Sequence, residues 1–147
     1  MVQLDLGMSP ELATIGYQGR KLDAFVRVLL RDSVARVIDV RAHASSHAPG
    51  FGKSAIAAAC KAAGIEYLHL KQAGNPFRHE EGGSESILAR YGAHLDAHPE
   101  VVDAVIAAAT GTRAALLCFE HAARDCHRSV LAARVQARLP EWRIVDI

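Results

Sequence analysis

The densest group of chemically reactive side chains lies within eleven positions, between 118 and 128. The group comprises Cys118, Glu120, His121, Arg124, Asp125, Cys126, His127 and Arg128. An ionised cysteine is a nucleophile, histidine and glutamate transfer protons, and arginine binds carboxylates and phosphates through two parallel hydrogen bonds. Packing alone rarely requires such a density of polar groups. We therefore interpret this segment as a reactive site.

The start of a predicted helix falls inside this segment. Asp125 is expected to be its N-cap. The first turn then contains Cys126, His127 and Arg128. The positive end of the helix dipole lowers the pKa of a cysteine in that turn and disfavours an arginine there. Cys126 is therefore a candidate reactive thiol, and Arg128 should have an anionic partner in the protein or in a ligand.

The rest of the chain alternates short apolar runs with helical patterns. Apolar and β-branched runs predict strands at 12–16, 35–41, 65–70, 114–119 and 142–147, and amphipathic spacing predicts helices at 22–30, 53–63, 84–97, 99–110 and 126–139. Such alternation predicts a parallel sheet, because right-handed crossovers place helices on both sheet faces. We therefore predict one three-layer α/β domain over residues 1–147, Rossmann-like, with about five mostly parallel strands.

Polar residues follow the end of each of the first four strands, where ligands bind in an open parallel sheet. They are Tyr17 and Arg20 after the first strand, Asp39 and Arg41 at the end of the second, His69 and Asn75 after the third, and Cys118 and Glu120 in the fourth. We expect these side chains to meet on one rim. Its arginines would hold an anion, with Asp39 or Glu120 as general base. A structural salt bridge is the alternative role of Asp39.

Two other patterns in the sequence carry less weight. Cys118 and Arg124 have the Cys-x5-Arg spacing of phosphate-binding loops in cysteine phosphatases, but no glycine lies between them and Glu120 would repel a phosphate. His94 and His98 are one helical turn apart, which an exposed amphipathic helix explains as well as a metal site does. We expect no metal and no cofactor.

The amino-acid composition indicates which classes of protein to expect. Half of the residues are hydrophobic and the formal net charge is +1, as in ordinary globular proteins. No apolar run approaches the roughly 20 residues that cross a bilayer, so no membrane is expected as a partner. An odd number of cysteines, three, without a signal-peptide pattern favours a cytoplasmic location.

Six motifs follow one another along nearly the whole chain. They are Thr14-Ile15-Gly16-Tyr17 with Arg20, Val37-Ile38-Asp39-Val40-Arg41, Pro49-Gly50-Phe51 with Lys53, Gly64-Ile65-x-Tyr67-x-His69-Leu70, Leu117-Cys118-x-Glu120 and Cys126-His127-Arg128-Ser129. In this order they resemble the bacterial and archaeal family catalogued as domain of unknown function 488. The resemblance implies an α/β fold, an unassigned activity and these polar motifs as the site. Tyr17, His69 and Cys118, which also follow strand ends, and Lys53, which comes from these motifs, are the expected pocket residues.

The sequence departs from the family pattern at two places. His47 stands where the family usually has a further arginine, and Gln72-Ala73-Gly74 replaces the common Leu-Gly-Gly. The resemblance therefore implies that anion binding or substrate size differs in this chain.

Three classes of function are consistent with the sequence. The first is an enzyme acting on a phosphorylated, nucleotide-like or nucleic-acid substrate. In it, Arg20, Arg41 and Arg128 bind the anion, Asp39 or Glu120 is the base, and Cys126 or His127 is the acid or nucleophile. The second is a thiol-based module, rhodanese-like or redox-sensing, that uses Cys126 or Cys118. The third is a binding domain without catalysis for an anionic small molecule or a partner protein.

Overall fold

The computed structural model of the protein describes residues 10–44, 51–78, 80–120 and 126–147. Its elements in chain order are β1 (Glu11–Gly16), α1 (Leu22–Arg31), β2 (Arg36–Asp39), α2 (Lys53–Ala62), β3 (Glu66–His69), the short 3₁₀ helix η1 (Lys71–Ala73), α3 (Ser84–Ala97), α4 (Pro99–Ala109), β4 (Ala114–Cys118), α5 (His127–Arg138) and β5 (Arg143–Asp146). The predicted alternation of strands and helices is confirmed.

Within the described ranges the strands form one five-stranded sheet in the order β3-β2-β4-β1-β5, with every neighbouring pair parallel. The strand β4 is central, because β2 does not pair with β1 but lies on the far side of β4. In this register Gly16 is opposite Cys118, and Asp39 is opposite Leu117. The carboxyl ends of the three middle strands therefore meet at one edge.

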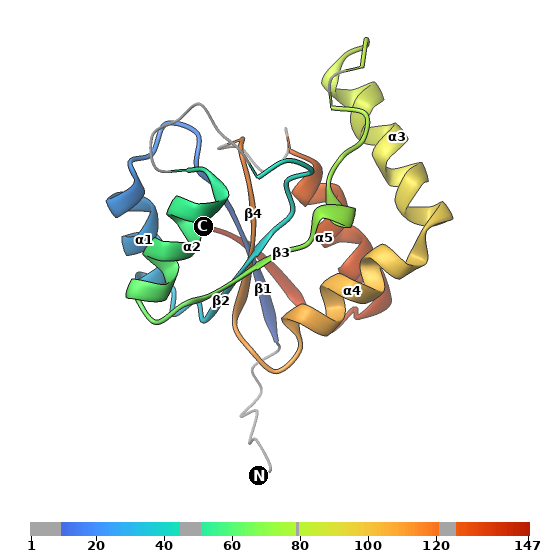
Figure 1. Ribbon diagram of the computed structural model, residues 1–147. Helices are drawn as coiled ribbons and strands as arrows, with labels where there is room; N and C mark the ends of the chain where they lie inside the picture. Colours follow the sequence, from blue (N-terminus) through green and yellow to red (C-terminus); the bar gives the residue numbers. More distant parts are fainter. Residues whose placement is uncertain (1–9, 45–50, 79, 121–125) are drawn as a thin grey trace.

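Helices cover both faces of the sheet, as the sequence predicts (Figure 1). One face packs against α1 and α2 through a core that includes Phe25, Ile56 and Leu117. The other packs against α3, α4 and α5 through a core that includes Leu116 and Leu131. Adjacent residues of β4 thus point to opposite faces, as the two-residue period of a strand requires.

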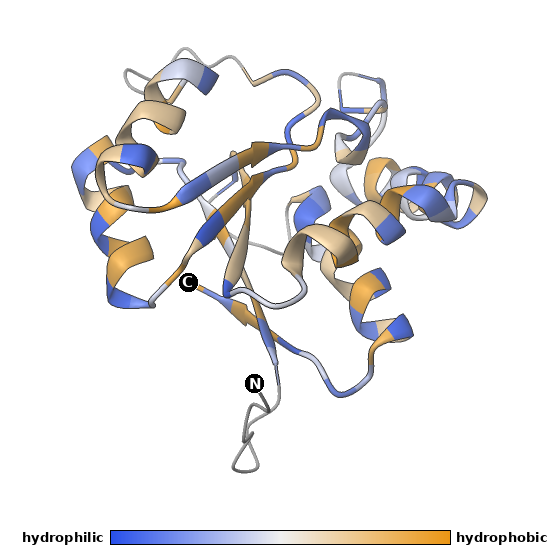
Figure 2. Cartoon of the chain, turned by 60° about the horizontal axis from the view of Figure 1, so that its bottom comes forward, coloured by the Kyte–Doolittle hydropathy of each residue, from blue (hydrophilic) through white to orange (hydrophobic). Residues whose placement is uncertain are grey.

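Hydropathy follows this layering. Figure 2 shows the strands coloured mainly as hydrophobic, while the hydrophilic residues of the helices lie on their outer surfaces. Among the described residues, Leu30 and Leu68 are the large hydrophobic side chains that stay exposed. None of the helices in the described part is long and apolar enough to span a membrane.

One difference from the predicted elements is at the start of α5. Cys126 is the N-cap, with φ −121° and ψ 144°, and the helix begins at His127. Asp125, the predicted N-cap, lies outside the described residues. The thiol of Cys126 therefore leaves the chain directly before the helix instead of from its first turn.

Candidate functional site

The polar residues at the carboxyl edge form two groups, one on each face of the sheet. Asp39 lies on the face of α1 and α2, where its contacts are Arg41 and Tyr67. Cys118 belongs to the core on the opposite face, together with Cys126. The single rim that we expected is therefore divided by the sheet itself.

Asp39 and Arg41 form a buried bidentate ion pair. The Asp39 side chain is 0% exposed and the Arg41 side chain is 1% exposed. Oδ1 of Asp39 accepts a hydrogen bond from Nε of Arg41 at 2.9 Å, and Oδ2 accepts one from Nη2 at 2.7 Å. The hydroxyl of Tyr67 also donates to Oδ2. Asp39 thus has the structural salt bridge that we considered as the alternative to a general base.

The other donors of Arg41 are also engaged inside the protein. Its Nη1 donates to the carbonyl oxygen of Phe51 at 2.7 Å, and the Tyr17 hydroxyl lies 3.4 Å from the same atom. The ring of Tyr17 stacks on that of Phe51, with centroids 4.6 Å apart. Burial lowers the pKa of Arg41, but the hydrogen bonds and charge of Asp39 outweigh burial, so the pKa lies above its usual value. This guanidinium is therefore fixed as part of the fold and does not face a ligand.

The other proposed anion-binding arginines also contact backbone carbonyls. Nη2 of Arg20 donates to the carbonyl oxygen of Ile147 at 3.2 Å. Nη1 of Arg128 donates to the carbonyl oxygen of Glu120 at 2.5 Å, and the Arg128 side chain is buried. Burial lowers the pKa of Arg20, and repulsion by Arg31 and Arg128 lowers it further. The three arginines thus do not form one open clamp in the described structure.

Two residues predicted to line the pocket lie at the α1 and α2 side. Lys53 is exposed at the first position of α2. Nε2 of His69 lies 2.7 Å from the carbonyl oxygen of Arg41. Because a carbonyl oxygen only accepts hydrogen bonds, Nε2 is the donor. His47, Pro49, Gly50 and Arg124, which the sequence comparison singled out, lie outside the described residues.

On the opposite face, His127 contacts the two cysteines and a backbone carbonyl group. Its Nε2 is 2.7 Å from the carbonyl oxygen of Val40. A carbonyl accepts only, so Nε2 carries a proton. Sγ of Cys118 lies 3.4 Å from Nδ1 and 3.9 Å from Nε2, which places it over the face of the ring, and Sγ of Cys126 lies 3.9 Å from Nδ1. His127 therefore contacts both sulfur atoms while a backbone carbonyl holds its Nε2.

The environment makes the two thiols unequal. A hydrogen bond from Cys118, together with His127, outweighs burial and holds the pKa of Cys126 well below its usual value. The same bond and burial raise the pKa of Cys118. These surroundings thus favour ionisation of Cys126 over ionisation of Cys118. The ring of Tyr91 closes the group, 5.1 Å from the His127 ring and nearly perpendicular to it.

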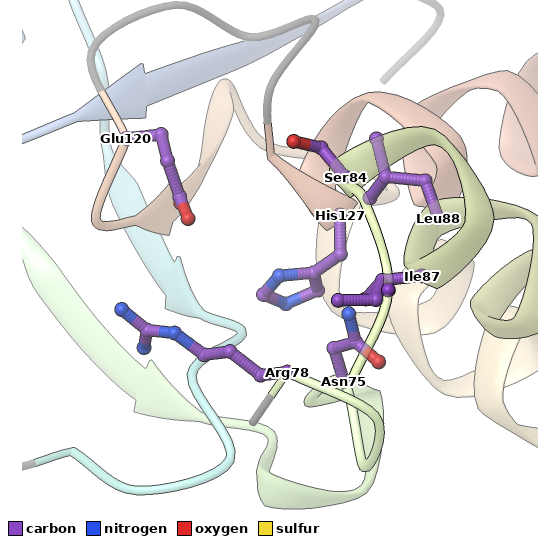
Figure 3. A pocket seen from close by; sticks show the side chains of 8 residues that line it. Asn75, Arg78, Ser84, Ile87, Leu88, Glu120 and His127 are labelled. Carbon is purple, nitrogen blue, oxygen red and sulfur yellow. The ribbon is translucent and has the colours of Figure 1, made fainter. Parts of the chain in front are cut away.

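A pocket of about 210 Å³ opens beside this group. It is lined by Asn75, Arg78, Gly82, Ser84, Ile87, Leu88, Glu120 and His127. Figure 3 shows the side chains of Glu120 and Arg78 extending into the space beside the His127 ring, with Ile87 and Leu88 on the opposite wall. The pocket is thus polar on one side and apolar on the other, as small-molecule sites commonly are.

Glu120 is the carboxylate of this pocket. Its Oε2 is buried and has no hydrogen-bond partner among the described residues. Burial raises the pKa of Glu120, the negative charge of Cys126 raises it further, and Arg78 opposes both effects. A buried acceptor without a partner costs free energy, so a donor from a ligand or an ion would stabilise it.

Arg78 is the pocket residue that our sequence analysis missed. Its side chain is exposed, and its guanidinium lies 5.7 Å from the centroid of the Phe119 ring. Among the described residues it forms no ion pair within 4.0 Å, whereas the exposed Arg90 pairs with Glu80. Arg78 lies in the irregular segment before α3, where no periodic sequence pattern indicates which side chains face a pocket. The length of that segment was the available signal.

Two glycines allow the pocket walls to approach the sheet. A Cβ atom on Gly16 would lie 1.8 Å from the carbonyl oxygen of Glu120, and one on Gly74 would lie 2.3 Å from Cα of Ala42. No side chain fits at either distance. Gly16 thus allows the segment carrying Glu120 to cross the end of β1, and Gly74 fixes the turn that carries Asn75.

A model of the family described as Domain of unknown function DUF488 matches residues 21–135, which is more than half of the chain. The chain belongs to this family. No curated protein and no solved structure matches the chain. The matched region contains the buried ion pair, the Cys118, Cys126 and His127 group and every residue that lines the pocket. Tyr17 and Arg20 lie before it. The DUF488 family thus covers the candidate site but assigns it no activity.

Proposed function

We propose that the protein is a small enzyme whose substrate is an anionic small molecule bound in the pocket between α3 and the loop after β4. The observation that carries this proposal is that Glu120 and Arg78 extend into one pocket. Oε2 of Glu120 is unpaired, and Arg78 has no ion pair, within the described structure. Polar groups that the fold leaves without partners are available to a ligand.

Arg78 supports an anionic ligand. Its guanidinium is exposed and can form two parallel hydrogen bonds with a carboxylate or phosphate. Asn75 and Ser84 contribute an amide and a hydroxyl to the same lining. Oδ1 of Asn75 already accepts a hydrogen bond from the backbone N–H of Phe77 at 2.9 Å, which leaves its amide group as a donor. These groups replace the arginine clamp that the sequence predicted. Nucleotide-like ligands and the ends of nucleic acids belong to the same chemical class.

Glu120 is the group best placed to transfer a proton to or from that ligand. Because burial raises its pKa, its uncharged form, which does not repel an anion, is favoured more than in an exposed glutamate. The ring nitrogens of His127 face Val40 and the two thiols, so they do not face the ligand. The thiols of Cys118 and Cys126 are each 1% exposed. The carboxylate of Glu120 therefore has the most direct access to a bound substrate, consistent with a role as general acid or base.

We expect Arg78→Ala to weaken binding of anionic ligands by about 10- to 100-fold, which is the range for losing a hydrogen bond to a charged group. The protein itself should keep its stability, because Arg78 is exposed and has no ion pair among the described residues. A thermal-shift screen with nucleotides, phosphosugars and inorganic phosphate, followed by calorimetric titration of the hits, measures this effect.

Arg90→Ala is the matched control. It removes the same charge from an exposed arginine of α3 that does not line the pocket. Its ligand affinity should equal that of the wild type. Equal affinity of wild type and Arg78→Ala for every hit would contradict the proposal. Binding that is lost on Arg78→Ala but never leads to turnover would instead indicate a binding domain.

The Cys118–His127 contact at 3.4 Å favours a thiol-based module as the second candidate. In that case iodoacetamide should label Cys126 or Cys118 much faster than Cys60 at neutral pH. Burial raises the pKa of Cys60 to about 11, with the charge of Asp39 adding to it, so Cys60 is a slow internal standard. Mass spectrometry of the labelled peptides measures the rates. Equally slow labelling at all three cysteines would remove this candidate.

A further inference from the structure

The group formed by Cys118, Cys126 and His127 has the dimensions of a metal centre. Its two sulfur atoms and one ring nitrogen lie within 4.8 Å of one another. In a tetrahedral zinc site with Zn–S near 2.3 Å and Zn–N near 2.05 Å, a sulfur and a nitrogen ligand are about 3.6 Å apart. The Sγ to Nδ1 distances of 3.4 Å for Cys118 and 3.9 Å for Cys126 lie on either side of that value.

The backbone contact of His127 is one that metal-binding histidines commonly make. A histidine that binds a metal through one ring nitrogen commonly donates the other N–H to a carbonyl or carboxylate, which fixes the ring and its tautomer. Nε2 of His127 donates to the carbonyl oxygen of Val40 at 2.7 Å. Nδ1 is thereby left on the side of the two sulfurs. Because Sγ of Cys118 lies over the ring face, 3.4 Å from Nδ1 and 3.9 Å from Nε2, the Cys118 side chain must turn toward the Nδ1 lone pair when an ion binds.

One side of this group is buried in the protein, and the other side faces the pocket. Cys118 and Cys126 are 1% exposed, and His127 is 6% exposed. Toward the pocket, the buried Oε2 of Glu120 has no partner within the described residues. His127 and Glu120 both line that pocket, which provides an entry path for an ion.

We propose that Cys118, Cys126 and His127 bind one zinc ion, whose fourth coordination position faces the pocket beside Glu120. Two thiolates and one imidazole with an open position form a ligand set found in catalytic zinc sites. Thiolate and imidazole ligands favour zinc over magnesium or calcium, which prefer oxygen ligands. Each thiol that is protonated in the apo protein releases its proton to solvent when the ion binds.

This zinc site goes beyond the proposed function, because metal binding requires no substrate. An ion with an open position at this place would polarise an oxygen atom of a ligand held by Arg78. From the sequence we expected no metal, because only His94 and His98 were considered as possible ligands and an exposed helix explains them.

The test uses the full chain, reduced and treated with a chelator, and then titrated with zinc alone or cobalt alone. We expect one equivalent of zinc per chain by elemental analysis after desalting. The cobalt form should show a thiolate-to-metal charge-transfer band and the intense visible bands of tetrahedral coordination. The cobalt spectrum of the wild type identifies sulfur ligands without any variant, so it stays decisive even if a substituted chain fails to fold.

Variants then identify the ligands. Cys118→Ser, Cys126→Ser and His127→Gln should each reduce zinc affinity by more than about 100-fold, which exceeds the usual effect of a residue outside the ligand shell. Cys60→Ser is the matched control, because Cys60 is a residue of α2 that is buried in the core on the other sheet face. Its zinc affinity should be unchanged. Circular dichroism of each apo variant shows whether it is folded.

A wild type that binds less than a tenth of an equivalent of zinc, or a cobalt form without a thiolate band, would overturn the inference. Zinc affinity lost equally in Cys60→Ser would also overturn it. Failure of the proposed function is distinguishable from this: Arg78→Ala would then bind anionic ligands like the wild type, while zinc binding by both proteins stayed intact.

Discussion

Asp39→Asn should lower the free energy of unfolding by about 3–5 kcal/mol, because removing one charge of a buried ion pair leaves the other uncompensated. Arg41 is 1% exposed, and Asp39 accepts hydrogen bonds from both its Nε and its Nη2. Tyr67 would also lose its charged acceptor. For a domain of this size the effect corresponds to a decrease in Tm of roughly 10–16 °C. Chemical denaturation followed by circular dichroism measures the change.

The matched control is Glu66→Gln on the neighbouring strand. Glu66 pairs with Arg36 at 2.9 Å, but the carboxylate side chain is 67% exposed. An exposed pair contributes at most about 1 kcal/mol, so this variant should be nearly as stable as the wild type. If Asp39→Asn were no more destabilising than Glu66→Gln, the buried ion pair at the end of β2 would not stabilise the fold.

Gly16→Ala should destabilise the protein by about 1–3 kcal/mol and also abolish ligand binding in the pocket. The added methyl group would meet the carbonyl oxygen of Glu120 at 1.8 Å and Nη1 of Arg128 at 3.1 Å. The backbone at Glu120 must then move away from the end of β1 and break its hydrogen bond with Arg128. A combined measurement of the unfolding free energy and of ligand affinity tests both effects.

Gly52→Ala provides the comparison for this prediction. Gly52 is the N-cap of α2 with φ −69°, and a Cβ atom there would meet nothing within 4 Å. We expect a loss of less than about 1 kcal/mol, as for other changes at an N-cap, with unaltered ligand affinity. If Gly16→Ala kept the affinity of Gly52→Ala, the position of Glu120 would not depend on the close approach at Gly16.

The fold could be predicted from the sequence because its elements are defined by local patterns. Helix 84–97 and the starts of the helices at 22, 53 and 99 agree with the structure to the residue. The strands are buried in an apolar sheet, so each one appears in the sequence as a short apolar run. The strand order is a non-local property, and no pattern in the sequence indicated that β4 inserts between β1 and β2.

The candidate site was predicted less completely, for reasons of geometry. The reactive residues Cys118, Cys126 and His127 do lie together. Asp39 points to the other face, because which face a strand residue occupies depends on its register with neighbouring strands. An arginine such as Arg41 can bind an anion, but this one is buried beside Asp39 and its donors are used within the protein. Arg78 lacks any periodic context, so only the folded structure places it beside Glu120.

The measurement that tests our central claim most directly is a two-dimensional amide NMR titration of the ¹⁵N-labelled 15.8 kDa chain with inorganic phosphate and with adenosine monophosphate. We predict that chemical-shift changes cluster at Asn75, Arg78, Ser84 and Glu120, which line the pocket. The hollow on the other side, lined by Ala57, Lys61 and Tyr67 among others, should stay unperturbed. Changes confined to that second hollow, or no changes with either probe, would contradict the assignment of the Glu120 pocket as the anionic ligand site.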